Sequence, residues 1–151
     1  MTDPKRMSDA SSDRTDEHAS DPRKLIPALQ ELLAAERAGA QVAVESLRQA
    51  TDPAQRQLLE RIRAGEADSC RRLIACLEHL GTEPSREIGS FHAKAMAIDD
   101  IAQRLAFIDR GQRWVIRRIQ SELPHCGDPR IRQELEVVLR THEVNSQWAP
   151  M

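Results

Sequence analysis

The sequence predicts an all-α protein, an antiparallel four-helix bundle made of two helical hairpins with a disordered N-terminal tail. Three observations point to this fold class. Apolar residues recur at three- and four-residue spacing through four long segments, the pattern of helices that bury one face. Three of the four segments begin with Asp-Pro, a pair that suits a helix N-cap and first turn. No stretch alternates apolar and polar residues over more than a few positions, so no strand is expected.

The domain organisation follows from composition. Residues 1–21 are rich in Asp, Ser and Thr and contain almost no large apolar side chain. Such a segment cannot offset its own ordering entropy, so we expect a disordered tail there. Residues 22–148 are expected to form the bundle as one domain, because a chain of 151 residues is long enough for a substantial core.

Four helices are expected, with bounds at about 22–50, 53–81, 99–123 and 129–147. The second illustrates the signals, since Asp52 suits the N-cap, Pro53 the first turn and Gly81 the C-terminal cap. The connections within each hairpin are short, which makes the paired helices antiparallel neighbours. A link of about 15 residues joins the two hairpins, with one short helical turn expected from Ser90 on.

Polar residues interrupt the apolar face of every predicted helix at a similar depth. They are Glu36 in the first helix, Glu66 and Ser69 in the second, Gln112 in the third, and His142 and Asn145 in the fourth. The leading residue of each set lies about 13 residues into its helix, roughly 20 Å from the start. The midpoints of antiparallel helices of similar length meet in one layer, so we expect a polar centre inside the bundle.

A buried carboxylate destabilises a fold unless it is paired, protonated or bound to a cation. Three ways of compensating Glu36 and Glu66 are open at this point. A metal ion could sit between them and His142. One carboxyl group could be protonated and share its proton with the other. Alternatively, Arg37 or Arg110 could reach inward from a neighbouring turn.

Several segments resemble the ferritin-like superfamily, whose metal-binding members take one Glu from each of two helices and a Glu-x-x-His pair from each of the other two. ELLAAERAGA resembles the first ligand helix and GEADSC the second, which puts Glu36 and Glu66 at ligand positions. FIDRGQRWV resembles the third helix, with Gln112 where a Glu commonly follows the Gly. LRTHEVN keeps only His142 of the fourth pair. The likeness covers about residues 25–147 and extends to a bacterial branch of the superfamily that shares AERAGA, GSFHAKAMAI and RLAFIDRGQRWV.

The resemblance implies a ferritin-like fold with an incomplete metal site. Of the six ligands of a di-iron member, three are present. Ser69 stands at a His position, and Gln112 and Leu139 stand at Glu positions. This argues against a standard di-iron ferroxidase. We expect instead that the polar layer holds one divalent metal (iron, manganese, copper or zinc), with a metal-free hydrogen-bonded network that fixes helix register as an equal alternative.

The expected metal ligands are Glu36, Glu66 and His142, and the residues expected around them are Ser69, Cys70, Gln112 and Asn145. Cys70 lies one turn after Glu66, where a thiolate would be a soft ligand or a redox sensor and a thiol would be a small buried filler. In the link between the hairpins, His92 and Lys94 either lie over the mouth of the site or are exposed.

Other features bound the function. No nucleophile elbow, phosphate-binding loop or Cys-x-x-Cys motif occurs, so no conventional catalytic constellation is predicted and enzymatic activity is left open. A net charge of -2 and 3% aromatic residues argue against nucleic-acid binding. Without an apolar run of about 18 residues or a secretory signal, we expect no membrane span and a cytoplasmic location. We expect reduced cysteines and a homodimer formed through a helix face, and a metal-free bundle would act by binding another protein.

Overall fold

The computed structural model of the protein describes residues 21–146. Residues 1–20 and 147–151 lie outside this range, so the disordered tail up to residue 20 and the last two residues of the predicted domain remain predictions, whereas Asp21, which was assigned to the tail, caps the first helical turn. The described part of the chain is all-α and contains no strand. Its elements are η1 (Pro22–Leu25), α2 (Ile26–Leu47), α3 (Pro53–His79), α4 (Phe91–Met96), α5 (Ile101–Glu122), η2 (Leu123–His125) and α6 (Pro129–Ser146).

Aspartates begin three of the long helices as the sequence predicts. The side chain of Asp52 accepts the backbone N–H of Gln55 at 3.0 Å, and Asp100 accepts that of Gln103 at 2.9 Å. Asp128 accepts two backbone N–H groups in the first turn of α6. Each carboxylate satisfies amide groups that have no partner within the helix, so these residues determine where α3, α5 and α6 begin.

The first long helix begins later than predicted. Asp21 accepts the N–H of Arg23 at 3.1 Å and so caps the 3-10 helix η1, whereas α2 begins at Ile26. Pro27 explains the difference, because proline has no N–H and fits an α-helix only in its first turn. The predicted start of this helix at Pro22 is therefore wrong.

A glycine cap ends α3. Gly81 has a φ of 72°, and its N–H donates to the carbonyl of Glu78 at 2.9 Å. The N–H of Thr82 donates to the carbonyl of Leu77, also at 2.9 Å. These two bonds form a Schellman motif, which needs the left-handed conformation that glycine adopts without strain. The predicted cap at Gly81 is confirmed, and the chain leaves the helix there.

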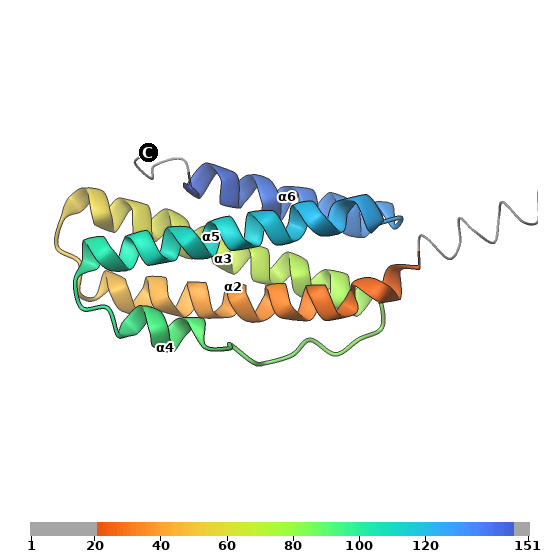
Figure 1. Ribbon diagram of the computed structural model, residues 1–151, viewed down its shortest axis with the longest axis horizontal. Helices are drawn as coiled ribbons and strands as arrows, with labels where there is room; N and C mark the ends of the chain where they lie inside the picture. Colours follow the sequence, from red (N-terminus) through yellow and green to blue (C-terminus); the bar gives the residue numbers. More distant parts are fainter. Residues whose placement is uncertain (1–20, 147–151) are drawn as a thin grey trace, which may run out of the picture.

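The four long helices lie along one another (Figure 1). α2 packs against α3 and α5, and α6 packs against the same two helices. The connection after α3 returns along α2 before α4 and α5 begin, so every packed pair of long helices is antiparallel while α3 and α5 run in the same direction (Figure 1). α4 contacts both α2 and α5. No described helix has the length and apolar character needed to cross a membrane.

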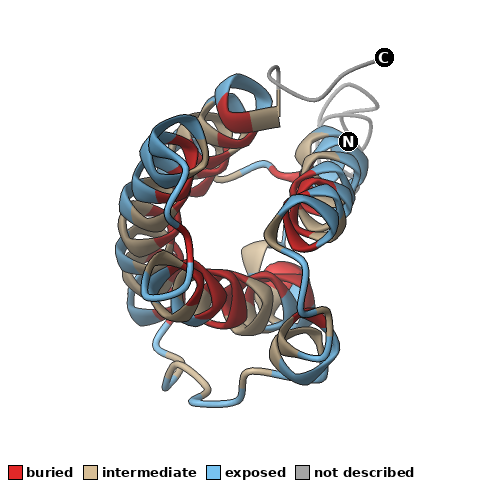
Figure 2. Ribbon diagram, turned by 90° about the vertical axis from the view of Figure 1, so that its left-hand side faces the viewer, coloured by how far each residue is buried: buried red, intermediate tan, exposed pale blue. Residues whose placement is uncertain are grey.

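Buried residues face the interior of this arrangement (Figure 2), where two apolar clusters lie on either side of a polar layer. The first cluster includes Leu33 and Leu77, and the second includes Val42 and Ile62. Glu36 lies between Leu33 and Val42 along α2. The apolar clusters supply the burial that stabilises the helices, and the layer between them carries the polar groups.

Candidate metal centre

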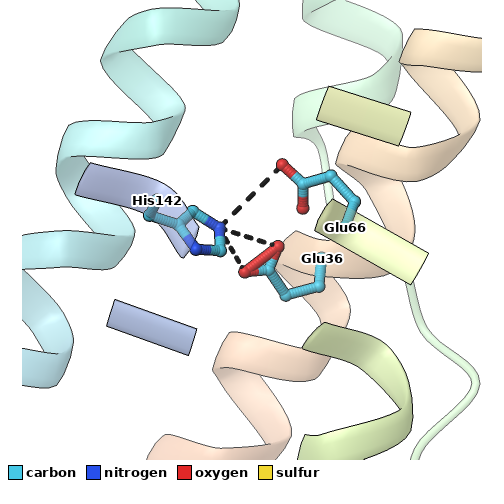
Figure 3. A group of neighbouring side chains, drawn as sticks. All are labelled: Glu36, Glu66 and His142. Carbon is cyan, nitrogen blue, oxygen red and sulfur yellow. Dashed lines mark hydrogen bonds and ion pairs between the residues drawn. The ribbon is translucent and has the colours of Figure 1, made fainter. Parts of the chain in front are cut away.

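Four helices each contribute one polar side chain to the central layer. Glu36 comes from α2, Glu66 from α3, Gln112 from α5 and His142 from α6, and none of these residues is more than 4% exposed. Figure 3 shows the two carboxylates and the imidazole turned toward one another. The prediction that these four residues meet in one layer is confirmed. It follows from the antiparallel packing of helices whose polar residues lie at similar depths.

Three of these side chains could hold one ion. The Nε2 atom of His142 lies 2.6 Å from Oε1 and 3.1 Å from Oε2 of Glu36, and 4.0 Å from Oε1 of Glu66. One ligand atom from each of the three residues falls within 4.8 Å of the others. Metal–ligand bonds to carboxylate oxygen and imidazole nitrogen are about 2.0–2.2 Å, so an ion between these atoms could reach all three after small side-chain adjustments.

The orientation of His142 suits a ligand. Its Nδ1 atom lies 2.8 Å from the carbonyl oxygen of Val138. Because a carbonyl oxygen can only accept, Nδ1 carries a proton and Nε2 is turned toward the carboxylates. Metal-binding histidines commonly use this arrangement, in which one ring nitrogen donates to a carbonyl and the other contacts the ion. A proton shared between Nε2 and Glu36 is the metal-free counterpart.

Burial makes the negative charge of the two glutamates unfavourable. It raises the pKa of Glu36 to about 7. Burial and then the neighbouring charge of Glu36 raise the pKa of Glu66 well above its usual range. The pair therefore retains protons at pH values where an exposed carboxyl group has lost them, unless a cation takes their place.

Among the described residues no arginine supplies that cation, so the alternative in which Arg37 or Arg110 reaches inward does not hold. The Nε atom of Arg37 donates to the carbonyl of Ser85 at 3.2 Å, which holds the connection against α2. Arg110 is exposed on α5. Each arginine directly follows a buried residue of its helix. Because neighbouring residues point to different sides of a helix, both arginine side chains point away from the layer.

Several buried oxygens in the layer have no hydrogen-bond partner among the described residues. They are Oε2 of Glu66, Oε1 of Gln112 and Oγ of Ser69, whereas Oε1 of Glu36, which also has no assigned hydrogen bond, lies 2.6 Å from Nε2 of His142. The Nε2 of Gln112 donates to Oε1 of Glu66, and the second oxygen of Glu66 and the amide oxygen of Gln112 have no donor among the described residues. Buried acceptors without a protein donor are usually satisfied by a proton, a water molecule or a cation. The carboxylates and the imidazole therefore fit a divalent metal in both chemistry and position.

The residues expected around the site differ in what they contribute. Gln112 contacts Glu66 directly, as predicted. Ser69 is buried without a hydrogen-bond partner, and Asn145 is buried but forms no described hydrogen bond with the four residues of the layer. Cys70 is half-buried, and burial together with the two glutamate charges raises its pKa to about 12. A thiol with that pKa is not a reactive thiolate. Cys70 is also absent from the group of three residues whose ligand atoms lie close together.

Sequence reasoning missed Gly39, which makes room for the site. A Cβ atom at Gly39 would lie 2.8 Å from Cδ of Glu66 and 2.9 Å from both of its carboxylate oxygens. A larger residue here would push the Glu66 carboxylate aside, so glycine leaves room for its present orientation. A glycine three residues after Glu36 in the middle of a helix was the available signal, because glycine there destabilises a helix by about 1 kcal/mol relative to alanine.

Sequence reasoning also missed a pocket of about 360 Å³ between α2 and α5. Glu36, Glu66 and Gln112 contribute to its lining, so it reaches the polar layer. Residues 88–91 of the connection line it too. The neighbouring residues His92 and Lys94, which were candidates for the mouth, do not: His92 pairs with Glu45 at 2.6 Å and Lys94 is exposed.

Comparison with known proteins adds one relationship. No curated protein and no solved structure matches the chain. Residues 23–150 match a family described as "Domain of unknown function (DUF6306)", a range that takes in the four long helices and every residue of the polar layer. The chain therefore belongs to the DUF6306 family.

Proposed function

We propose that this protein is a ferritin-like four-helix bundle that binds one divalent metal ion in its core. Glu36, Glu66 and His142 are the proposed ligands. The observation that supports this most strongly is the convergence of their ligand atoms within 4.8 Å at a fully buried position, beside oxygens without hydrogen-bond donors. A divalent cation would neutralise two carboxylates that no described arginine or lysine neutralises.

The ligand set suits several first-row transition metals and argues for a single ion. Two carboxylates and one imidazole suit iron, manganese and zinc, and copper binds such nitrogen and oxygen ligands tightly. A di-iron centre would need a second imidazole and further bridging carboxylates, but Ser69 and Gln112 occupy two of those positions. We therefore propose a mononuclear site and not a standard ferroxidase. When bound, a redox-active ion would supply chemistry toward small oxidants.

A second candidate function is a metal-free bundle that acts as a protein-interaction module. The specific observation in its favour is that two contacts already link the layer, from His142 to Glu36 and from Gln112 to Glu66. Such contacts between four helices would fix their register without an ion. In either case we propose that the protein forms a homodimer through a helix face and acts in the cytoplasm.

Elemental analysis of untagged protein separates the two candidates. We expect about one equivalent of iron, manganese, copper or zinc per chain in the wild type and less than a tenth of that in Glu66→Ala and Glu66→Gln. Asp109→Asn is the matched control, because Asp109 is equally buried but pairs with Arg113 at 2.7 Å outside the layer. No metal in the wild type after anaerobic loading would support the metal-free module instead.

A further inference from the structure

The charged residues that line the pocket between α2 and α5 are engaged with other groups. They are Glu31 at the exposed mouth and Glu36 and Glu66 at the buried inner end. Glu31 pairs with Arg118 at 3.5 Å, and an oxygen of Glu36 lies 2.6 Å from Nε2 of His142. An ion that enters the pocket therefore gives up its hydration without gaining a free countercharge from the described residues, which is unfavourable.

The oxygens of the central layer that lack donors do not select the occupant of this pocket either. Oε2 of Glu66 and Oε1 of Gln112 are both fully buried, so they do not face the pocket. Oε1 of Glu66 already accepts a hydrogen bond from Nε2 of Gln112. The exposed lining residues Gly89 and Ser90 lie at the mouth. A molecule in the pocket therefore keeps any polar group near the solvent and presents an apolar body to the interior.

Apolar side chains form the wall between the mouth and the inner end. They include Ala34, Ile88, Phe91, Ile108, Trp114 and Val115. Trp114 is 36% exposed whereas Ile108 and Val115 are buried, so the wall extends from the surface into the core. The volume of about 360 Å³ lies within the range of pockets that hold small organic molecules. Removal of hydrocarbon surface from water by such a wall is the main favourable contribution that the pocket offers a ligand.

The outer wall is held in place by contacts between α4 and α5. The ring of Phe91 stacks on that of Phe107, with the centroids 5.0 Å apart. Gly111 leaves room for this ring, since a Cβ atom there would lie 2.9 Å from it. The pocket is therefore formed before any ligand arrives, and a ligand does not have to order the wall at the expense of its affinity.

We propose that this pocket binds a small uncharged molecule with a hydrocarbon body, which lies between α2, α5 and the connection. The proposal goes beyond metal binding and does not depend on it. Because Glu36 and Glu66 line the inner end, the bound molecule lies beside two of the proposed metal ligands. His142 is absent from the lining, so the pocket and the metal site share only part of their residues.

Tryptophan fluorescence provides a direct test, because Trp114 lines the pocket. In full-length protein stripped of metal with EDTA, Trp148→Phe leaves Trp114 as the single tryptophan reporter. Toluene should change this fluorescence in a saturable way, confirmed by calorimetry. Affinity should rise about fourfold per CH₂ group from toluene to propylbenzene. Benzoate and benzylammonium carry a charge next to the same ring and should each bind at least about tenfold more weakly than toluene at pH 7.

Two variants locate the binding. Ala34→Leu and Ala35→Leu each add a side chain to the wall, so each should weaken toluene binding by about tenfold or more. Ala54→Leu, at an exposed position of α3, is the matched control and should bind toluene like the wild type. Circular dichroism identifies a variant that does not fold, and the other variant then decides.

Four outcomes would overturn the proposal. They are the absence of a saturable toluene signal, binding of benzoate or benzylammonium as tight as that of toluene, wild-type affinity in both folded wall variants, and a Trp114 signal that changes with protein concentration and excludes toluene. The last outcome would mean that a second copy of the chain fills the pocket. Toluene should bind both to protein stripped of metal and to His142→Phe, so absent metal with intact toluene binding would contradict the metal proposal alone.

Discussion

Two buried polar sites in this protein are built in opposite ways. Arg104 is 1% exposed, and its guanidinium donates twice to the carbonyl of Ile98, at 2.9 and 2.6 Å, and once to Oγ of Ser46 at 3.1 Å. The central layer is just as buried, but Oε2 of Glu66 and Oε1 of Gln112 have no hydrogen-bond donor among the described residues. The first site satisfies its own polar groups and the second does not.

The contrast separates a structural site from a binding site. Arg104 joins the start of α5 to the end of α2 and to the segment before α5, so its hydrogen bonds stabilise the fold itself. The central layer carries unsatisfied acceptors and a charge that burial disfavours, which reduces stability unless a cation binds. Such a trade of stability for function is common at binding sites.

Removal of the satisfied site should have the largest effect. We expect Arg104→Met to lower the free energy of unfolding by about 3 kcal/mol, because the carbonyl of Ile98 and the hydroxyl of Ser46 lose their donors in the interior. Chemical denaturation measures this directly. Arg110→Met, on the exposed face of the same helix, is the control and should change stability by less than about 0.5 kcal/mol. Similar values for both variants would remove the contrast on which the interpretation depends.

Removal of a carboxylate from the unsatisfied site should have the opposite sign. In metal-free protein at high pH, Glu66→Gln should raise the free energy of unfolding by about 1–2 kcal/mol, since a neutral amide replaces a carboxyl group whose charged form is disfavoured by burial and by Glu36. The new amide can still accept the hydrogen bond from Gln112. Exposed Glu60→Gln is the control. A loss of stability in Glu66→Gln would mean that the carboxylate belongs to a structural network.

The pH dependence of stability should reflect the same acid pair. Glu36 has a pKa of about 7 in the folded protein against an ordinary value of 4.5, so the folded state binds its proton more tightly than the unfolded state. The stability that this provides is complete below pH 4.5 and is lost as the pH rises through 7. Relative to the double variant E36Q/E66Q, metal-free wild type should therefore lose stability over this window in urea titrations. Parallel profiles for the two proteins would contradict the assigned direction.

The smallest effect on stability should come from Gly39→Ala. Alanine favours the helix by about 1 kcal/mol, but its Cβ would displace the Glu66 carboxylate, so the net change should be below 1 kcal/mol. Metal affinity should nevertheless fall by about tenfold or more, because the displaced ligand no longer points at the ion. In a Glu66→Ala background, Gly39→Ala should raise the free energy of unfolding by the full difference in helix propensity between glycine and alanine, about 1 kcal/mol. Calorimetric titration with Zn²⁺ and thermal unfolding check the two parts.

The two polar sites also differ in how far the sequence predicted them. Glu36, Glu66, Gln112 and His142 were predictable because each interrupts an apolar face at a similar depth, and helix geometry turns equal depth into one layer. The role of Arg104 was not predictable, since its partners are a loop carbonyl and the side chain of Ser46 on another helix. Helical periodicity does not relate either partner to Arg104.

Features that depend on neighbouring residues were predictable from the sequence, and features that depend on the path of the connection were not. The caps at Asp52 and Gly81 depend on neighbouring residues and were predicted correctly. The alternative of an inward arginine does not hold for Arg37, because Arg37 donates to the carbonyl of Ser85 in the connection. The pocket was missed for a related reason, since Phe91 and residues before it reach α5 by the path of that connection, which local sequence does not specify.

The most direct test of the central claim is anomalous diffraction from crystals soaked with Zn²⁺ or Mn²⁺. We predict one strong peak in the core, within about 2.0–2.3 Å of an oxygen of Glu36, an oxygen of Glu66 and Nε2 of His142. The peak should be absent from crystals of Glu66→Gln grown and soaked in the same way. Saturating metal that gives no peak at this position in the wild type would contradict the account.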